Sequence, residues 1–372
     1  YSFTSTGVFP IRYRDQFIDA KAVMLAALAR LVIEVECKLM DYLRQNQQAK
    51  LAFEAGVSAG FSGFVGIDWS GAKTPFIAGI QLAMAGLDTA SPQTIAAPQQ
   101  QHWSRQNVHD FLCDQAAQTV AGAPLLVGID FAFAHPFADC DSYFPDCADS
   151  PRDAAALWQL VDQVNGDMPH FYGGAMFRHA VWGEYYLAPP DFDAPRYATR
   201  RRLTEIVAKA SGRSPSPTFK AVGADNVSTG SMAGMRLLHQ LRLTLGDQLA
   251  IWPFDDVTAK PDTVRLVLVE IFPSYYFYRV GMSPAKRAAA QADFLTKALG
   301  FYDSDGVDPQ FVAKGADADE ADAIIAAAAL RYFARHPTAS LPTMFDLPDA
   351  ISLTARQEGW IFGVDPRNAL SS

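Results

Sequence analysis

A four-residue segment, Val-Gly-Ile-Asp, occurs twice in the sequence and constrains the fold more than any other feature. The copies occupy residues 65–68 and 127–130, 62 residues apart. Each closes a short apolar run with no polar alternation, which is typical of a strand buried in the centre of a sheet. Each also places an aspartate at the carboxyl end of its strand, where open α/β sheets bind their ligands. The repeat therefore predicts an α/β sheet with Asp68 and Asp130 at one edge.

Two buried carboxylates at one edge have two chemical interpretations. An ionised carboxylate is costly to bury unless it pairs with a cation or binds a metal. Carboxylate oxygens are the ligands that Mg²⁺ prefers, so Asp68 and Asp130 favour a bound divalent cation. The alternative is a structural arrangement in which each carboxylate forms a salt bridge with a basic side chain.

The composition indicates a soluble globular protein and excludes one class of nucleic-acid binder. The chain has 372 residues, of which 49% are hydrophobic and 19% charged, and its formal net charge is −9. A protein that coats nucleic acid non-specifically needs many phosphate contacts, which this charge disfavours. The four cysteines form no Cys-x-x-Cys pair, and the longest early apolar run, residues 24–35, is too short to span a membrane. We therefore expect a cytoplasmic protein with no membrane partner.

The order of the predicted elements favours an RNase H-like fold. Strands are expected at residues 64–68, at 76–84 and within 94–103, followed by an amphipathic helix at 107–120 and a strand at 125–129. Three antiparallel strands, a helix and a strand that returns beside the first are the opening of an RNase H-like mixed sheet flanked by helices. Further elements are expected as helices at 154–164, 200–210, 231–245, 284–299 and 318–334, a strand at 264–272, and a short strand or packed tail at 359–364.

The chain is expected to have two parts, one of them interrupted. An apolar stripe at helical spacing within residues 17–55 predicts an N-terminal helical extension over residues 1–60. This extension packs on its own domain or against a second copy of the chain as a homodimer. Residues 61–372 form the RNase H-like domain. Within it, the proline-rich and aromatic segment 134–262 is predicted to be an insertion that serves as a lid or substrate-facing subdomain.

Three further carboxylates are candidates for the same site. Glu270 ends an apolar strand, and Asp319 and Asp322 share one face at the start of a helix because they are three residues apart. Together with the first two aspartates they would supply oxygen ligands for two Mg²⁺ or Mn²⁺ ions about 4 Å apart. The structural alternatives are stabilisation of the helix dipole by the two helical aspartates and an ion pair of Glu270 with an arginine such as Arg279.

These carboxylate segments resemble a known family. Residues 66–68, 128–130, 269–274 and 319–323 are similar to the family labelled domain of unknown function 429, whose members are predicted RNase H-like nucleases. The resemblance covers roughly residues 62 to 365, and the aspartate pair on the last helix also resembles that of RuvC-type resolvases. It implies that Asp68, Asp130 and Asp322 hold the metal ions, with Asp319 or Glu270 assisting. RuvC-type enzymes usually carry a glutamate at the position of Asp130.

Candidate substrate contacts lie outside the carboxylate set. Arg201 and Lys220 belong to the basic stretch 200–220, which grips phosphates or forms a solvated helix face. Ser231 lies in the glycine-rich segment 223–234 that leads into a helix, an arrangement suited to an anion or to a simple helix cap. Lys73 lies in the turn after the first strand.

Three functions are compatible with these features. The first is a metal-dependent phosphodiester hydrolase, a nuclease whose substrate is a nucleic acid or a nucleotide. The second is an ATPase or kinase of the actin and sugar-kinase type, in which residues 68–73 would form the first phosphate loop. The third is a non-catalytic binding protein on the same fold.

Overall fold

The computed structural model describes residues 60–369 except for short gaps at 99–101, 191, 211, 224–225, 258, 260–261, 285–289, 316 and 336–343. The chain divides into two units, and all described residues belong to the second, Ala59–Ser372. The predicted N-terminal helical extension and the homodimer assigned to it lie outside the described residues.

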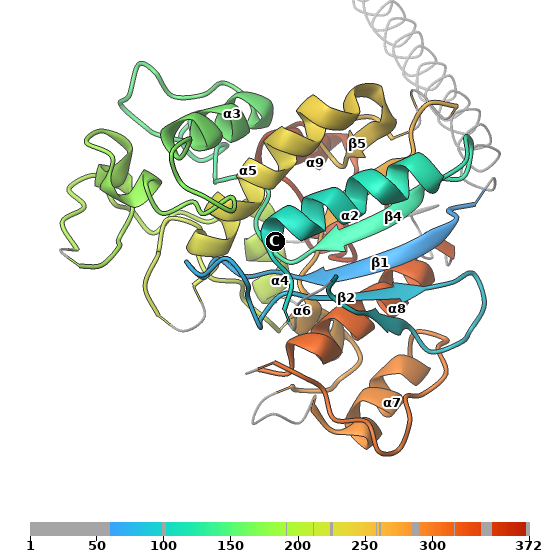
Figure 1. Ribbon diagram of the computed structural model, residues 1–372. Helices are drawn as coiled ribbons and strands as arrows, with labels where there is room; N and C mark the ends of the chain where they lie inside the picture. Colours follow the sequence, from blue (N-terminus) through green and yellow to red (C-terminus); the bar gives the residue numbers. More distant parts are fainter. Residues whose placement is uncertain are drawn as a thin grey trace, which may run out of the picture. The chain divides into compact units, whose positions relative to one another are not determined.

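A six-stranded mixed sheet forms the centre of the described chain (Figure 1). Its strand order is β3-β2-β1-β4-β6-β5. β1 pairs antiparallel with β2, and β2 with β3, whereas β1, β4, β6 and β5 run parallel. The strands are β1 (Gly63–Asp68), β2 (Gln81–Ala85), β3 (Gln93–Ile95), β4 (Leu125–Ile129), β5 (Leu249–Ile251) and β6 (Leu266–Glu270). The predicted α/β class is confirmed, as is the predicted return of a strand beside the first.

The two Val-Gly-Ile-Asp copies lie side by side in matching register. Gly66 pairs with Gly128, and Ile67 pairs with Ile129. On the next strand, Glu270 pairs with Ile129. The carboxyl ends of β1, β4 and β6 therefore meet at one edge of the sheet.

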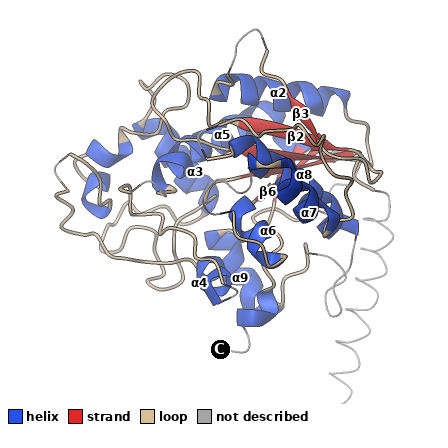
Figure 2. Cartoon of the chain, turned by 90° about the horizontal axis from the view of Figure 1, so that it is seen from below, coloured by secondary structure: helices blue, strands red, loops and turns tan. Residues whose placement is uncertain are grey.

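Helices cover both faces of this sheet. Helix α2 (Arg105–Gln118) packs on one face, where Val108 and Leu112 share a core with Val65 and Ile67 of β1. Helix α8 (Asp319–Arg335) packs along β1 and β2 on the other face (Figures 1 and 2). The alanine-rich surface of α8 allows this close approach, because Ala323, Ala326 and Ala327 are the residues that face Gly66 of β1.

The predicted insertion, residues 134–262, shares its core with the sheet. It contains α3 (Ala154–Val164), α4 (Leu203–Ala210) and α5 (Ser228–Leu245), close to the predicted helices. Trp158 of α3 and Met232 of α5 belong to the same hydrophobic cluster as Val65. The segment also supplies edge strand β5, which the sequence analysis did not predict. The segment thus continues the sheet and its core, and its role as a lid stays a prediction.

The remaining elements differ in detail from the prediction. The second strand begins at Gln81, because the residues before it form turns and a single bridge between Ile77 and Trp103. Residues 359–364 form a packed tail rather than a strand, in which Ile361 makes an isolated bridge to Glu270. The other helices are α6 (Pro273–Arg279), α7 (Ala292–Gly300), α9 (Asp349–Glu358) and the short 3-10 helices Met176–Arg178, Trp182–Tyr185, Gly246–Gln248 and Pro366–Ala369. Among the described residues, no helix combines the length and apolar character that crossing a membrane requires.

Candidate functional site

Strand alternation places Asp68 on the face of the sheet that α8 covers. Val65 and Ile67 point toward α2, so Gly66 and Asp68 point toward α8. Gly66 confirms this direction, since a Cβ atom there would lie 2.3 Å from the Ala323 carbonyl oxygen and 2.7 Å from the Ala327 nitrogen. The glycine of the repeated segment thus lets α8 touch the strand, and the aspartate two residues later meets the first turn of α8.

The same geometry applies to the second copy on β4. A Cβ atom at Gly128 would meet Leu330 of α8 at 2.9 Å and Ile271 at 2.4 Å. Asp130 follows two residues later, directly after the end of β4, and its amide donates to the Ile67 carbonyl oxygen at 3.0 Å. The two aspartates therefore emerge from adjacent parallel strands on the same face.

Helix α8 contributes its first turn to this edge. Asp319 and Asp322 are both in that turn, where negative side chains stabilise the helix dipole. Asp319 forms a hydrogen bond with the side chain of Asp68. Gly79 also lies near Asp319: a Cβ atom added at Gly79 would be 3.8 Å from Oδ2 of Asp319. We call Asp68, Asp130, Asp319 and Asp322 the acidic cluster.

The acidic cluster raises the pKa of its own members. Burial raises the pKa of Asp68 well above its usual value, and repulsion from the other three carboxylates adds to this. Burial, followed by repulsion from Asp130 and Asp319, has the same effect on the pKa of Asp322. The pKa of Asp130 is raised to about 8 by burial and by the charge of Glu270. Carboxylates that repel one another in this way are typical of sites that hold protons or cations.

The oxygen atoms of the cluster do not converge on one point. Within residues 60–369, apart from the gaps given above, no three His, Cys, Asp or Glu side chains have the arrangement of a metal site. The cluster offers the hard oxygen ligands that Mg²⁺ and Mn²⁺ need, but its side chains would have to move for three of them to bind one ion.

Glu270, the fifth predicted carboxylate, lies beside the cluster but has its own partner. Both of its oxygens accept from Arg202, at 2.6 and 2.7 Å, and Oε2 also accepts from the Phe133 amide at 3.0 Å. Its side chain is almost wholly buried. The structural alternative of an ion pair is therefore present, although the arginine is Arg202 rather than Arg279. Glu270 still acts on the site through its charge, which raises the pKa of Asp130.

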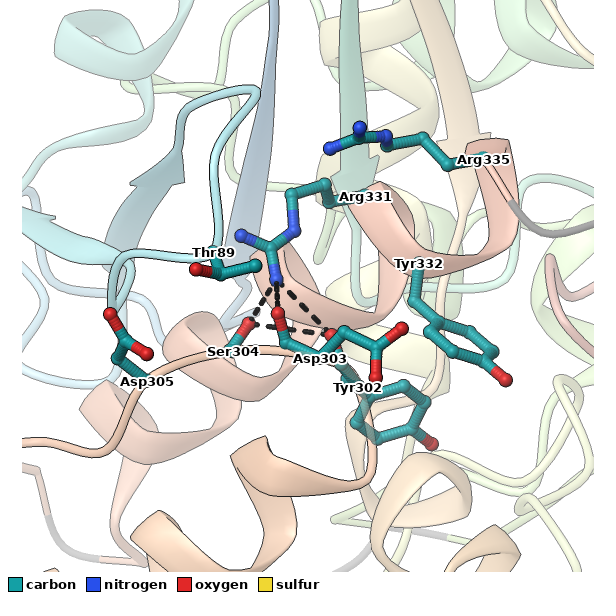
Figure 3. Close-up of a pocket in the computed structure, with 8 residues that line it drawn as sticks. All are labelled: Thr89, Tyr302, Asp303, Ser304, Asp305, Arg331, Tyr332 and Arg335. Atoms are coloured by element: carbon teal, nitrogen blue, oxygen red, sulfur yellow. Dashed lines mark hydrogen bonds between the residues drawn. The ribbon is translucent and has the colours of Figure 1, made fainter.

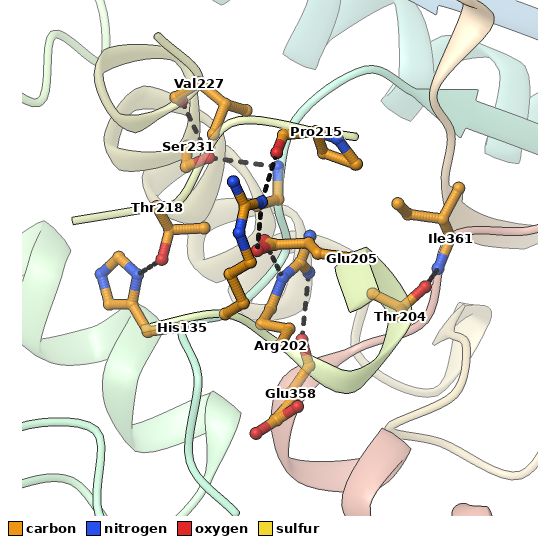
Figure 4. A network of polar contacts seen from close by, with 12 residues as sticks. His135, Arg202, Thr204, Glu205, Pro215, Thr218, Val227, Ser231, Glu358 and Ile361 are labelled. Carbon is orange, nitrogen blue, oxygen red and sulfur yellow. Dashed lines mark hydrogen bonds and ion pairs between the residues drawn. The ribbon is translucent and has the colours of Figure 1, made fainter. Parts of the chain in front are cut away.

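Arg202 connects Glu270 to a second buried carboxylate, Glu205. Figure 4 shows Arg202 between Glu205 and Glu358. Its Nε donates to Glu205 at 2.8 Å, and it also donates to the Glu358 carbonyl oxygen at 3.1 Å. The two carboxylates share this one buried arginine, and the other cation near Glu205 is the partly exposed Arg201, at 4.0 Å. Burial accordingly raises the pKa of Glu205 to about 7. The network joins β6, α4 and α9 behind the acidic cluster.

The predicted substrate contacts have different environments. Ser231 is buried and saturated, because its hydroxyl accepts from the Ala132 amide at 3.1 Å and donates to the Val227 carbonyl oxygen at 2.9 Å (Figure 4). Arg201 is partly buried and donates to the Pro215 carbonyl oxygen at 2.7 Å. Lys220 is partly buried, and Lys73 is exposed. The arginine run at 200–202 is not a solvated helix face, since Arg200 and Arg202 are both buried.

Arg105 is a site residue that the sequence analysis missed. It is fully buried at the first position of α2, and its guanidinium donates to three backbone carbonyls: Ser70 at 3.0 Å, His170 at 2.9 Å, and Ala72. Burial lowers the pKa of Arg105 to about 10. It fixes the turn that follows Asp68. A lone arginine at a helix start carries no sequence signal for such a role.

A pocket of about 570 Å³ lies at the opposite end of α8 (Figure 3). Twelve residues of helix separate Asp319 from Arg331, which corresponds to about 18 Å. Arg331 donates to carbonyl oxygens of Asp88, Tyr302 and Asp303 and to the Ser304 hydroxyl, so it joins two loops at the pocket. The lining residues are Thr89, Tyr302, Asp303, Ser304, Asp305, Arg331, Tyr332 and Arg335. This pocket is separate from the acidic cluster.

Comparison of the chain with protein-family models, curated proteins and solved structures gave no match. The resemblance to the family of domain of unknown function 429 therefore stays a prediction that rests on the quoted segments.

Proposed function

We propose that the protein is a metal-dependent phosphodiester hydrolase of RNase H-like fold. The observation that carries the proposal is the acidic cluster: four aspartates from two adjacent strand ends and one docked helix, in which burial and neighbouring carboxylates raise the pKa values of Asp68, Asp130 and Asp322. Such a set repels itself unless protons or cations neutralise it. A divalent cation would neutralise it at neutral pH.

The strand order supports the fold part of the proposal. Strands β3, β2 and β1 are antiparallel, and β4 and β6 follow parallel to β1. This is the order that an RNase H-like sheet requires, with β5 added at the edge. It also explains why the repeated Val-Gly-Ile-Asp segment lies on the central pair, since those two strands end where the ligand of such a sheet binds.

The residues present fit divalent cations in chemistry. Asp68, Asp130 and Asp322 would hold the ions, and Asp319 would assist after giving up its hydrogen bond to Asp68. A bound ion lowers the pKa of its water ligand and stabilises charge on a phosphate oxygen. Glu270, held by Arg202, would orient Asp130 through their mutual repulsion rather than bind the ion itself.

Hydrolysis of a model phosphodiester tests this function. Wild type with Mn²⁺ or Mg²⁺ should cleave bis-(p-nitrophenyl) phosphate, single-stranded DNA or RNA, and Asp68→Asn should lose at least 100-fold. The matched control is Asp114→Asn, an exposed carboxylate on α2. Absence of cleavage of any of these substrates by wild type, with either metal, would contradict the proposal. Phosphate release from ATP in the same assay would instead favour the actin and sugar-kinase alternative.

A further inference from the structure

The loop that leads into α8, residues 312–318, borders the acidic cluster. At its start the Ala313 amide donates to the Ala290 carbonyl oxygen at 3.1 Å, which ties the loop to the segment before α7. At its end the chain enters α8 at Asp319, a member of the cluster. The position of this loop therefore bears directly on one of the four carboxyl groups.

Gly315 of this loop lies directly against the carboxyl group of Asp319. A Cβ atom at Gly315 would overlap Cγ and Oδ2 of Asp319, so no larger residue fits there. The backbone of Gly315 has φ +95°, a conformation that glycine adopts far more readily than any other residue. Asp319 also forms a hydrogen bond with the side chain of Asp68. Its carboxyl group therefore touches the loop as well as Asp68.

Ala318, the residue before Asp319, has a strained backbone. Its φ is +70°, in the left-handed region that is unfavourable for a residue with a Cβ atom. Its carbonyl oxygen accepts from the amides of Ala321 at 2.7 Å and Asp322 at 3.2 Å, so it starts the hydrogen bonding of α8. Strained residues persist only where the surrounding contacts hold them, and they are concentrated at functional sites. Contacts near the start of α8 must therefore hold the loop in this conformation.

Glu320 supplies such contacts. Its carboxylate accepts from the Lys314 amide at 2.8 Å, and its own amide donates to the Lys314 carbonyl oxygen at 3.1 Å. The side chain of Glu320 is buried. The ammonium of Lys314 lies 4.0 Å from the carboxylate, but this side chain is 76% exposed and adds little. Glu320 therefore holds the loop through the backbone of Lys314, directly before Gly315.

We propose that Glu320 is a positioning residue of the acidic cluster. By holding Lys314 it keeps Gly315 against Asp319, and so keeps the carboxyl group of Asp319 beside that of Asp68. Without this hold, mutual repulsion would turn Asp319 away, because its side chain is only partly buried. A divalent cation would then meet two of its carboxylate ligands already side by side. The inference rests on the proposed function, because the cation is the one that the cluster would bind.

Substitutions at Glu320 separate its hydrogen bond from its charge. Glu320→Gln removes the charge but keeps an acceptor for the Lys314 amide. Glu320→Asp keeps the charge but is one methylene too short to reach that amide, and Glu320→Ala removes both. The matched control is Asp293→Ala, because Asp293 is exposed and is the second residue of α7, as Glu320 is of α8. This control reports any general effect of a negative charge in a first helical turn.

The first measurement needs no metal. Urea denaturation in EDTA at pH 7.5 gives the shift of the midpoint that Asp68→Asn causes in wild type and in each Glu320 variant. The shift in Glu320→Gln should equal that in wild type. The shift in Glu320→Asp and Glu320→Ala should be clearly smaller, because Asp319 no longer lies beside Asp68. Equal shifts in all four backgrounds would overturn the inference, whether or not the protein binds metal.

The second measurement is calorimetric titration of Mn²⁺ at pH 7.5. Glu320→Asp and Glu320→Ala should bind about tenfold more weakly than wild type, an effect typical of residues that orient metal ligands. Glu320→Gln and Asp293→Ala should bind like wild type. Wild-type affinity in Glu320→Asp and Glu320→Ala would overturn the inference, and so would equal weakening in Glu320→Gln. No binding by wild type would contradict the proposed function alone, since the urea measurement still decides whether Glu320 positions Asp319.

Discussion

Asp130 makes the stability of the metal-free protein depend on pH in a way that one substitution can remove. Its pKa is raised from 3.8 to about 8. The folded protein therefore holds this proton more tightly than the unfolded chain does. The stability that the protonated group supports is complete below about pH 4 and is lost progressively as the pH rises toward about 8.

The magnitude follows from proton linkage. One extra proton on the folded state changes the free energy of unfolding by about 1.4 kcal/mol per pH unit. Asp130 is partly exposed, so solvent screening reduces its share, and we expect a contribution of about 0.7 to 1.4 kcal/mol per pH unit. Asp130→Asn removes this contribution and also relieves Asp322, whose pKa Asp130 helps to raise.

The assay is urea denaturation in the presence of EDTA at several pH values from about 4.5 to about 7.5, a window inside the range that linkage assigns to Asp130. The free energy of unfolding should fall with pH in wild type, and clearly less steeply in Asp130→Asn. Asp114→Asn, an exposed carboxylate, should follow wild type. Equal slopes for wild type and Asp130→Asn would refute the view that Asp130 is held protonated by its surroundings.

Three further substitutions test the packing around the site. Gly66→Ala places a methyl group 2.3 Å from the Ala323 carbonyl oxygen, and we expect thermal denaturation to show a loss of about 1 to 3 kcal/mol, with Gly300→Ala unaffected. Arg202→Met removes the cation that the buried Glu270 and Glu205 share, so urea denaturation at pH 7 should show a free energy of unfolding lower by about 3 to 5 kcal/mol. A loss below about 1 kcal/mol would contradict the burial of these ion pairs. In Arg105→Lys the lysine keeps the charge but cannot reach all three carbonyl oxygens that Arg105 binds. Limited proteolysis should therefore cut the variant within residues 69–73 or 168–172 faster than wild type. Equal rates of cleavage would contradict the role of Arg105 in fixing these segments.

The centre of the fold could be predicted from the sequence because its signals are local. Each Val-Gly-Ile-Asp copy combines an apolar run with a terminal carboxylate, and the identical spacing within each copy becomes identical register in the sheet. Asp319 and Asp322 could be placed beside Asp68 because an alanine-rich helix is able to lie close to a strand. The glycine in each copy explains the closeness, which the sequence alone did not show.

The partners of the buried charges could not be predicted, because they depend on contacts between distant segments. Arg202 meets Glu270 across 68 residues of chain, and Arg105 meets Ser70 and His170 from a third segment. In the sequence, Arg202 is one of three consecutive arginines that suggest a solvated face. Ser231 has the sequence context of an anion ligand, yet its hydroxyl is saturated by the backbone, and the unpartnered hydroxyl belongs to Ser228. Only packing distinguishes these neighbours.

The central claim is that the acidic cluster binds divalent cations, and calorimetric titration of Mn²⁺ into metal-free protein at pH 7.5 tests it most directly. The account predicts saturable binding by wild type, proton release from the cluster as the ions bind, and at least tenfold weaker binding by Asp68→Asn but not by Asp114→Asn. Wild type that shows no saturable binding, or Asp68→Asn that binds as tightly as wild type, would contradict it.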